Sequence, residues 1–248
     1  MRSRGAGRGP AVAVGGFVVA IVALVACRSF YVLPEAPDAA ADALGSPDAT
    51  SPCRVPTANR LFCDDFDEGA LGATWDRGAL PHGSLDPTSV SPPRSLRIQF
   101  QDPPDPVVET LEKDLDVSST ANIHIEFDLR IDTVAPVYPV ALYCGPDGYA
   151  IVLNLDGYVN EQAGPTPYGG YKFGTFPVGT WKHVRLGIRR GDGSVDMQID
   201  GVTVIVSTKV AKPAMLAAGA CSLVVGMYYA EKHLSWDGRL DNVLVTTF

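Results

Sequence analysis

Strict alternation of apolar and polar residues is the feature that most limits how this chain can fold. It is clearest in residues 122–132, where every second side chain is large and apolar: Ile123, Ile125, Phe127, Leu129 and Ile131. Successive side chains of a β-strand point to opposite faces, so this segment has one face to bury and one to leave in water. Burial of each apolar side chain contributes about 1.5–3 kcal/mol before the entropy cost of ordering it. The pattern predicts a half-buried strand.

The same period of two recurs along the chain and predicts an all-β protein. Further strands are expected at Leu96–Gln101, Val107–Leu111, Val137–Tyr143, Tyr149–Leu155, Lys182–Arg190, Leu223–Tyr229 and Leu240–Thr246. Long surface loops are expected at Pro81–Arg94 and Pro103–Pro106, and one short helix within Ala211–Ala220. Many short strands with little helix predict a two-sheet antiparallel β-sandwich.

Three turns are expected between these strands. Asp156-Gly157 and Asp200-Gly201 supply hairpin turns, because glycine accepts the positive φ that such turns need. Arg190-Gly191-Asp192-Gly193 is expected to form the third. We prefer this interpretation to an adhesive Arg-Gly-Asp motif, since a turn uses the same residue types.

The N-terminus predicts export. Arginines precede the apolar run Ala11–Leu24, and Leu24-Val25-Ala26-Cys27 has the form of a lipobox, as in bacterial lipoproteins. This resemblance implies that residues 1–26 are a cleaved signal peptide and that Cys27 carries the lipid. An uncleaved anchor and a plain signal peptide are the alternatives, although the run is shorter than the roughly 20 residues of a membrane-spanning helix. We expect a membrane-anchored, extracytoplasmic lipoprotein at the outer membrane or cell surface.

Composition divides the remainder into a tether and one domain. Residues 27–52 are rich in Pro, Ala, Asp and Ser, which cannot bury enough surface to fold, so they are expected to be a tether. Residues 53–248 are expected to be the β-sandwich. Their four cysteines suit an oxidising compartment. Of the three ways to pair them we favour Cys53 with Cys63 and Cys144 with Cys221, the second closing a long loop worth about 4 kcal/mol.

Charge excludes some partners. Removal of residues 1–26 takes away three arginines and no acidic residue, so the net charge goes from −8 to −11. Such a chain is not expected to bind nucleic acid, whose phosphates require basic surface. Attachment to a membrane is expected through the lipid alone. Acidic polysaccharides are disfavoured, whereas neutral glycans or a divalent cation suit the excess of carboxylates.

Several motifs resemble the laminin G-like and concanavalin A-like jelly rolls of the lectin and glucanase superfamily. Gly179-Thr180-Trp181-Lys182-His183-Val184, with Val195–Ile199 and the following turn, resembles their late hairpin. Leu240-Asp241-Asn242-Val243 resembles their closing strand and Phe62–Phe66 their opening one. The resemblance spans about residues 60–248 and implies a concanavalin A-like jelly roll. It does not select a function, because the superfamily includes lectins, matrix-binding modules, hydrolases and lyases.

The catalytic pattern of the hydrolases is incomplete. They use Glu-x-Asp-x-x-Glu to place two carboxylates on one strand face. Glu126-Phe127-Asp128 begins this pattern, but Ile131 stands where the second Glu belongs. We therefore predict no catalytic residue. Lyase chemistry has candidate residue types in Arg97, His124, Arg185 and Tyr171, without a geometry that joins them.

Glycan binding requires aromatic side chains for the C–H faces of sugars and polar side chains for their hydroxyls. Tyr168-Gly-Gly-Tyr171-Lys-Phe173 is the richest such segment. The predicted glycan-binding residues are Tyr168, Tyr171, Phe173, Asn154, Glu126, Asp128, Arg97 and Arg185. Two alternatives stay open: Tyr171 and Phe173 pack the core, and Glu126 and Asp128 form a solvated strand face.

Asp241 is the candidate ligand of a structural calcium ion, since related jelly rolls join their first and last strands through such an Asp. Asp65 or Asp67 would supply a second carboxylate, the ligand type that calcium prefers. A salt bridge from Asp241 to Arg239 or Arg94 is the alternative.

Together these features predict a lipid-anchored, non-catalytic module that binds glycan or mediates adhesion, with a polysaccharide or glycoprotein ligand. A polysaccharide-degrading enzyme of the same fold and a purely structural envelope lipoprotein are the alternatives.

Overall fold

The computed structural model describes residues 51–118, 121–133, 135–145, 148–163, 166–217, 219–230 and 232–248. The predicted signal peptide, the lipidated Cys27 and nearly all of the predicted tether lie outside these residues. Within the described part of the chain, no helix is long and apolar enough to cross a membrane.

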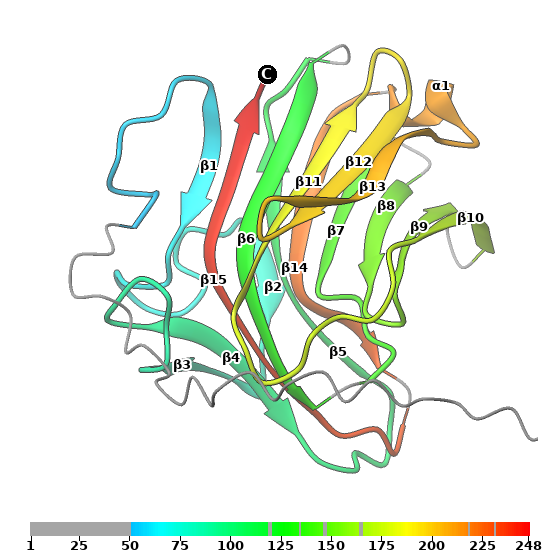
Figure 1. Ribbon diagram of the computed structural model, residues 1–248. Helices are drawn as coiled ribbons and strands as arrows, with labels where there is room; N and C mark the ends of the chain where they lie inside the picture. Colours follow the sequence, from blue (N-terminus) through cyan, green and yellow to red (C-terminus); the bar gives the residue numbers. More distant parts are fainter. Residues whose placement is uncertain are drawn as a thin grey trace, which may run out of the picture. The chain divides into compact units, whose positions relative to one another are not determined.

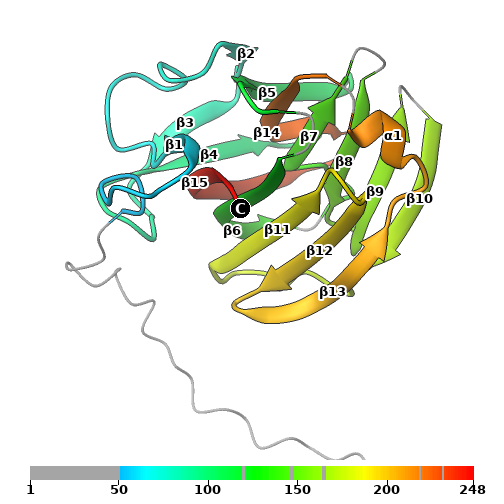
Figure 2. The same cartoon turned by 90° about the horizontal axis from the view of Figure 1, so that it is seen from above.

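Two antiparallel sheets make up the described part (Figures 1 and 2). Sheet A has the strand order β13 (Val202–Lys209), β12 (Ser194–Ile199), β11 (Lys182–Arg189), β6 (Asn122–Thr133), β15 (Trp236–Thr247), β4 (Ser95–Phe100) and β3 (Gly83–Asp86), and β1 (Arg60–Asp64) also pairs with β15. Sheet B has the order β10 (Thr166–Lys172), β9 (Tyr158–Ala163), β8 (Tyr149–Asn154), β7 (Val140–Cys144), β14 (Cys221–Ala230), β5 (Val107–Leu115) and β2 (Arg77–Ala79). The predicted two-sheet β-sandwich is confirmed.

The alternating residues of β6 show how the sequence builds this core. All five apolar side chains that predicted the strand are buried. β6 pairs with β11 in a register that places Phe127 beside Val184 and Glu126 beside Arg185. Apolar residues of both strands thus face sheet B, and their polar residues form the outer face of sheet A.

Four strands depart from the sequence prediction, and one of them is β10, since no strand was predicted at residues 166–172. β3 lies inside Pro81–Arg94, which was expected to be a loop. β2 has only three residues, too few to show a period, and β9 carries the fully buried Glu161 on its inward face, which breaks the apolar alternation. The predicted short helix is confirmed as α1 (Pro213–Leu216).

Both predicted disulfides are present. Cys53 bonds to Cys63, and Cys144 bonds to Cys221 across a sequence separation of 77 residues. Cys144 and Cys221 are direct partners in the β7–β14 ladder, so the second bond joins two neighbouring strands of sheet B.

The Arg-Gly-Asp triplet forms the turn between β11 and β12, as predicted. Arg190 is 0% exposed. Its guanidinium donates hydrogen bonds to the backbone carbonyls of Leu216 (3.0 Å), Ser118 (2.7 Å) and Gly219 (2.6 Å). The triplet cannot present its arginine to a partner, because that side chain holds neighbouring loops together.

Candidate functional site

The outer face of sheet A is charged, and its charges pair with one another. Three of the predicted glycan-binding residues, Glu126, Asp128 and Arg185, lie together there. His183 Nδ1 lies 3.0 Å from Asp128 Oδ1, and Arg185 Nε lies 3.3 Å from Glu126 Oε1. The hydrogen bond from His183 holds the pKa of Glu126 below its usual value. For Glu126 this geometry matches the solvated, charge-paired strand face that the sequence left open as an alternative, whereas Asp128 is buried, at 7% exposed, and also accepts from Asn242 Nδ2.

The two carboxylates change the titration of His183. Hydrogen bonds to Asp128 and Glu126 raise the pKa of His183 to about 10, against a smaller lowering by burial. A histidine whose pKa is raised in the folded state stabilises the fold fully below its unfolded pKa of 6.5, and the contribution is lost as the pH rises through about 10.

We expect His183→Gln to remove this contribution. The side chain is 47% exposed, so solvent screening limits the ion pair to about 1 kcal/mol, or about 2–4 °C in Tm. The variant should melt lower than the wild type by this amount near pH 6, and the difference should vanish above pH 10. Asp241 titrates in both proteins and cancels in the comparison. Thermal melts of the wild type and of His183→Gln from about pH 6 to above pH 10 check this prediction, and His233→Gln is the control. A difference that does not change with pH would contradict the assignment.

Arg97 belongs to a second charged group on the same face. Its guanidinium lies 2.7 Å from Asp237 Oδ2 and 3.4 Å from Asp86 Oδ2. The hydrogen bond to Asp237 raises the pKa of Arg97. Because its partners are side chains of this chain, Arg97 is not aimed at a ligand.

Asp241 anchors a loop from inside the sandwich. It is 0% exposed and accepts hydrogen bonds from the backbone N–H groups of Val90 (2.8 Å), Ser91 (3.0 Å) and Asn242 (2.8 Å). Burial raises the pKa of this carboxyl to about 8, and the nearby charge of Asp128 adds to the rise, while the N–H donors oppose it. The carboxylate therefore points inward, and its donors are these N–H groups and the Ser91 hydroxyl rather than Arg239 or Arg94.

The other two candidate calcium ligands are also held by donors of the chain. Asp65 accepts from Ser51 Oγ and from the backbone N–H of Asp67, and Asp67 accepts from the backbone N–H of Arg94 at 3.0 Å. Burial raises the pKa of Asp67. Among the described residues, no three His, Cys, Asp or Glu side chains are grouped to hold a metal ion. The arrangement fits a hydrogen-bonded anchor rather than a calcium site, and calcium binding stays a prediction of the sequence alone.

The remaining predicted glycan-binding residues belong to sheet B. Tyr171 and Phe173 pack against the core, and the Tyr171 hydroxyl lies within hydrogen-bond distance of two acceptors, the buried Glu161 carboxylate and the Lys209 carbonyl. Asn154 Oδ1 accepts from the Asp156 N–H in the β8–β9 turn. Tyr168 is exposed beside Lys212, which lies 5.5 Å from its ring centre.

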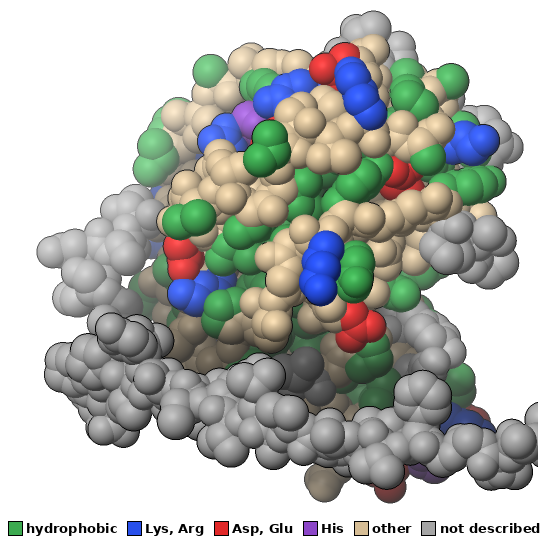
Figure 3. Space-filling model, turned by 45° about the vertical axis from the view of Figure 1, so that its right-hand side comes forward, with side chains coloured by type: hydrophobic (Ala, Val, Ile, Leu, Met, Phe, Trp, Pro, Cys, Tyr) green, Lys and Arg blue, Asp and Glu red, His purple; other side chains and the backbone are tan. Residues whose placement is uncertain are grey.

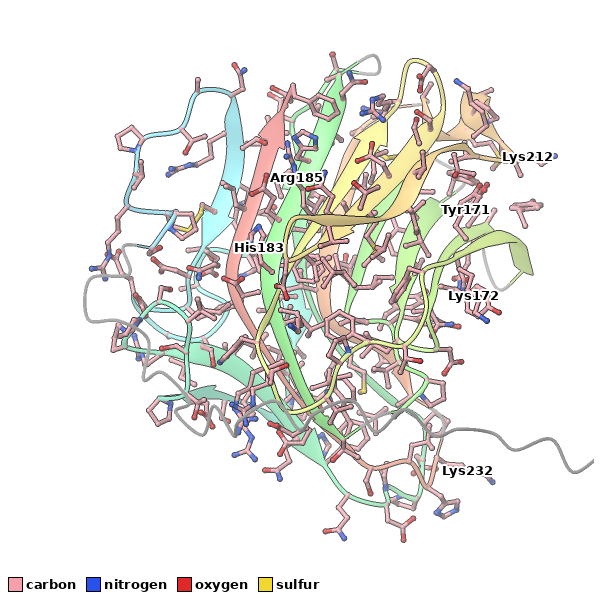
Figure 4. The ribbon with its side chains drawn as sticks, viewed as in Figure 1. Tyr171, Lys172, His183, Arg185, Lys212 and Lys232 are labelled. Atoms are coloured by element: carbon pink, nitrogen blue, oxygen red, sulfur yellow. A yellow bond between two sulfur atoms is a disulfide. The ribbon has the colours of Figure 1, made fainter. Side chains whose placement is uncertain are left out.

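The eight predicted residues therefore do not form one site. Figure 4 shows His183 and Arg185 with β6 and β11, apart from Tyr171, Lys172 and Lys212 around β9, β10 and α1. On the side of the molecule that carries β9 and β10, hydrophobic side chains reach the surface between charged ones (Figure 3).

The tyrosines of the fold are concentrated on sheet B. Every described tyrosine, from Tyr138 to Tyr229, lies in a strand of sheet B or directly before one. Three of them, on β7, β9 and β14, point away from the core, because their neighbours in the strand are buried: Tyr143, Tyr158 and Tyr228. Tyr158 is 37% exposed and Tyr228 is 36% exposed. We call the outer face of sheet B, which carries these three residues, the tyrosine face.

The tyrosine face is concave along its strands. Tyr143 pairs with Ser222 in the ladder, and Tyr228 lies six residues further along β14. Six residues of a straight strand span about 20 Å, yet the two tyrosine rings are 5.6 Å apart. β14 must therefore bend outward between them, where Gly226 has a φ of 120°. The Tyr143 side chain packs on small apolar side chains of the same face, all of them buried: Ala141, Ala150, Val152 and Val224.

The Tyr143 hydroxyl is the most unusual polar group of this face. Its oxygen is buried and has no well-formed hydrogen bond to a described residue, and the hydrogen-bonding group beside it is the Tyr228 side chain. Burial raises the pKa of this phenol, and the nearby Tyr228 and Glu112 raise it further. The group is therefore neutral and can donate a hydrogen bond. An unsatisfied buried hydroxyl costs about 1–3 kcal/mol, which a ligand oxygen or a water molecule would recover.

Polar side chains flank the tyrosines at both ends. On β9, Asn160 and Gln162 point outward, and on β5 Glu112 and Asp114 do the same. Arg77 of β2 pairs with Glu112 (2.6 Å) and with Asp114 (2.9 Å). The face therefore carries neutral amide groups at its β9 end and paired charged groups at its β5 end, and both kinds of group form hydrogen bonds.

This face offers binding groups rather than a catalytic set. The four histidines of the sequence, all of them described, lie in β6, β11 and loops and not in a strand of sheet B. Its two carboxylates on β5 share one arginine. The constellation of histidine, arginine and tyrosine that a lyase would need is therefore not assembled here.

Sequence reasoning missed most of the tyrosine face. Tyr143, Tyr228, Asn160 and Gln162 are not among the predicted glycan-binding residues. The available signal was the outward parity of the tyrosines in the predicted strands Val137–Tyr143 and Leu223–Tyr229. Their proximity could not be predicted, because it depends on which strands are neighbours.

Comparisons with known proteins identify the fold and no family. No protein-family model and no curated protein sequence matches the chain. The cellulose-induced protein Cip1 is 14% identical over 75% of this chain and 96% of its own, with a TM-score of 0.50. A carbohydrate esterase of the Shiga toxin-encoding bacteriophage phi24B is 13% identical over 76% of this chain and 98% of its own, also with a TM-score of 0.50.

A sialidase of Trypanosoma rangeli is a third similar structure, 13% identical over 77% of this chain, with a TM-score of 0.51. The match covers only 31% of the sialidase chain. Identities this low show the fold and not the activity. The matches show that the chain has the fold of a two-sheet jelly-roll β-sandwich.

Proposed function

We propose that this protein binds a glycan on the tyrosine face without altering it. The observation that carries this proposal is the pair of tyrosine rings 5.6 Å apart on the outer face of sheet B: the exposed ring of Tyr228 and the ring of Tyr143, whose hydroxyl has no well-formed hydrogen bond. Sugar rings combine apolar C–H faces with hydroxyl groups, so an aromatic ring next to an unsatisfied donor matches both parts of a sugar.

A neutral glycan is the class that fits this face best. The chain carries a net charge of −8, and the β5 end of the face contributes two carboxylates to one arginine. Acidic polysaccharides would meet repulsion there. Asn160 and Gln162 supply uncharged donors and acceptors at the other end, which suit the hydroxyl groups of neutral sugars.

Location outside the cytoplasm belongs to the same proposal. The two disulfides suit an oxidising compartment, and the lipobox motif that ends in Cys27 suits attachment through a lipid. A glycan-binding module held in this way would act at the outer membrane or cell surface.

Substitution of the two tyrosines tests the binding proposal. Tyr228→Ala removes the exposed ring and is expected to weaken glycan binding about tenfold, or about 1.4 kcal/mol. Tyr143→Phe keeps the ring and removes only the donor, so a loss of about 1 kcal/mol, or about fivefold, is expected. A glycan array followed by titration calorimetry measures both.

Phe248→Ala is the matched control, since Phe248 is an exposed aromatic residue that contacts His124 on sheet A. Its binding should equal that of the wild type. The proposal is wrong if no glycan binds, or if both tyrosine variants bind as the wild type does. Release of new reducing ends or unsaturated sugars from a bound polysaccharide would instead favour an enzyme.

A further inference from the structure

A cavity of about 330 Å³ opens at the β2 edge of sheet B. Its lining residues are Leu71, Gly72, Trp75, Arg77, Gly78, Ala79, Leu80 and Leu111. Seven of these eight belong to the continuous stretch 71–80, so one segment of chain wraps around the cavity. The volume is near the lower limit of small-molecule sites, which measure about 300–1,000 Å³.

Arg77 connects the cavity with the tyrosine face. It lines the cavity, and its guanidinium pairs with Glu112 and Asp114 on the outer face of sheet B. β2 is the last strand of that sheet in the described part of the chain. A ligand that crosses the strands from β9 toward β2 therefore arrives at this cavity where the sheet ends.

The lining combines the two kinds of surface that a sugar ring requires. Leu71, Leu80 and Leu111 supply apolar side chains. The polar part of the lining is the Arg77 guanidinium, whereas Gly72 and Gly78 are required by close packing, since a Cβ would meet Leu111 Cδ2 at 3.1 Å at the first and the Thr110 carbonyl oxygen at 2.1 Å at the second. The Trp75 ring is fixed in place, because its indole N–H donates to Asp64 Oδ2 at 2.6 Å. A cavity of this kind accepts a pyranose more readily than a purely apolar or a charged group.

We propose that this cavity holds the terminal sugar of the glycan, so that the protein recognises chain ends. The inference rests on the proposed binding to the tyrosine face and adds to it a specificity. Internal segments would contact the tyrosines alone, whereas a chain end would also fill the cavity. Strands are spaced about 4.8 Å apart, so a chain of several sugars spans the distance from β7 to β2.

Titration with defined oligosaccharides tests whether the cavity holds the terminal sugar of the glycan. The probes are di- to hexasaccharides of the cello-, xylo-, manno- and chito-series, each intact, reduced to the alditol at one end, or O-methylated at the other. We expect modification of one of the two ends, whichever enters the cavity, to weaken binding at least tenfold. Ala79→Trp, which fills the cavity from an exposed edge strand, should weaken the binding of the intact probes to the same extent.

Val178→Trp is the control for Ala79→Trp, since Val178 is also exposed and does not line the cavity. If Tyr228→Ala weakens binding but Ala79→Trp and both end modifications leave it unchanged, the tyrosine face stands and the terminal-sugar proposal is overturned. If none of the variants changes binding, both proposals fail. The end-modified probes need no variant, so the test holds even if Ala79→Trp destabilises the fold.

Discussion

Replacement of Arg190 by methionine is expected to lower the Tm by about 10 °C, corresponding to a loss of about 4 kcal/mol in the free energy of unfolding. Methionine matches the arginine stem in length and keeps the position apolar. It removes the hydrogen bonds to the carbonyls of Ser118, Leu216 and Gly219. Leu216 is buried, so its carbonyl left without this donor costs about 1–3 kcal/mol, and each of the two lost bonds to the exposed residues Ser118 and Gly219 adds about 1 kcal/mol.

The expected effect is large because a single side chain, that of Arg190, holds three segments in place of regular secondary structure. The three carbonyls come from the loop before β6, from the end of α1 and from the segment that leads into β14. None of these segments is fixed there by a strand ladder. Burial lowers the pKa of the Arg190 guanidinium, which shows how far the group is removed from water.

Arg189→Met is the matched control, because Arg189 is the preceding residue and carries the same side chain on the solvent side. Its ion pair with Asp196 is partly exposed, at 2.5 Å, and such pairs contribute about 0–1 kcal/mol. Thermal and denaturant unfolding of both variants measures the difference. If Arg190→Met unfolds within about 1 kcal/mol of Arg189→Met, the three loops are held by other contacts and the assignment fails.

The sandwich could be predicted because its signal is local. β4, β6 and β11 of sheet A each carry their own alternation, and the burial of Ile123 or Val184 follows from parity along one segment. Disulfide pairing was also predictable, since loop lengths and an even number of cysteines limited the choices. β9 escaped prediction because Glu161, accepted into the core by Tyr149 and Tyr171, removed the apolar signal from its inward face.

The candidate site could not be predicted in the same way, because it depends on contacts between distant segments. Glu126, Asp128 and Arg185 were correctly placed on the polar face of sheet A, but only the register of β6 against β11 shows that they neutralise one another. Tyr143 and Tyr228 meet because β7 and β14 are neighbours and β14 bends. The period of a sequence indicates which face of a strand a side chain lies on, but not which side chains of other strands it contacts.

Removal of the Cys144–Cys221 disulfide is the second change with a large expected effect. The bond closes a loop of 77 residues, for which the chain-entropy model gives about 4.5 kcal/mol of stabilisation. Cys53 and Cys63 are separated by only 10 residues, and the same model gives about 2.7 kcal/mol. The double variant Cys144→Ala with Cys221→Ala should therefore melt well below Cys53→Ala with Cys63→Ala, by about 4–7 °C.

Denaturant unfolding of the two double variants at one pH checks this order. Both sulfur atoms of the long loop are buried, so alanine substitution also leaves unfilled space, which adds to the loss. Equal stability of the two double variants would contradict the entropic explanation.

The double variant Cys144→Ala with Cys221→Ala also tests whether the disulfide contributes to glycan binding or to stability alone. β7 and β14 carry Tyr143 and Tyr228, and a slip of one residue between them would turn Tyr143 into the core. Five ladder pairs, from Cys144 with Cys221 to Val140 with Val225, fix this register independently of the sulfur bond. We therefore expect Cys144→Ala with Cys221→Ala to bind glycan as the wild type does at temperatures well below its lowered Tm. Lost affinity in a variant that is still folded would mean that the disulfide, and not the ladder, positions the tyrosines.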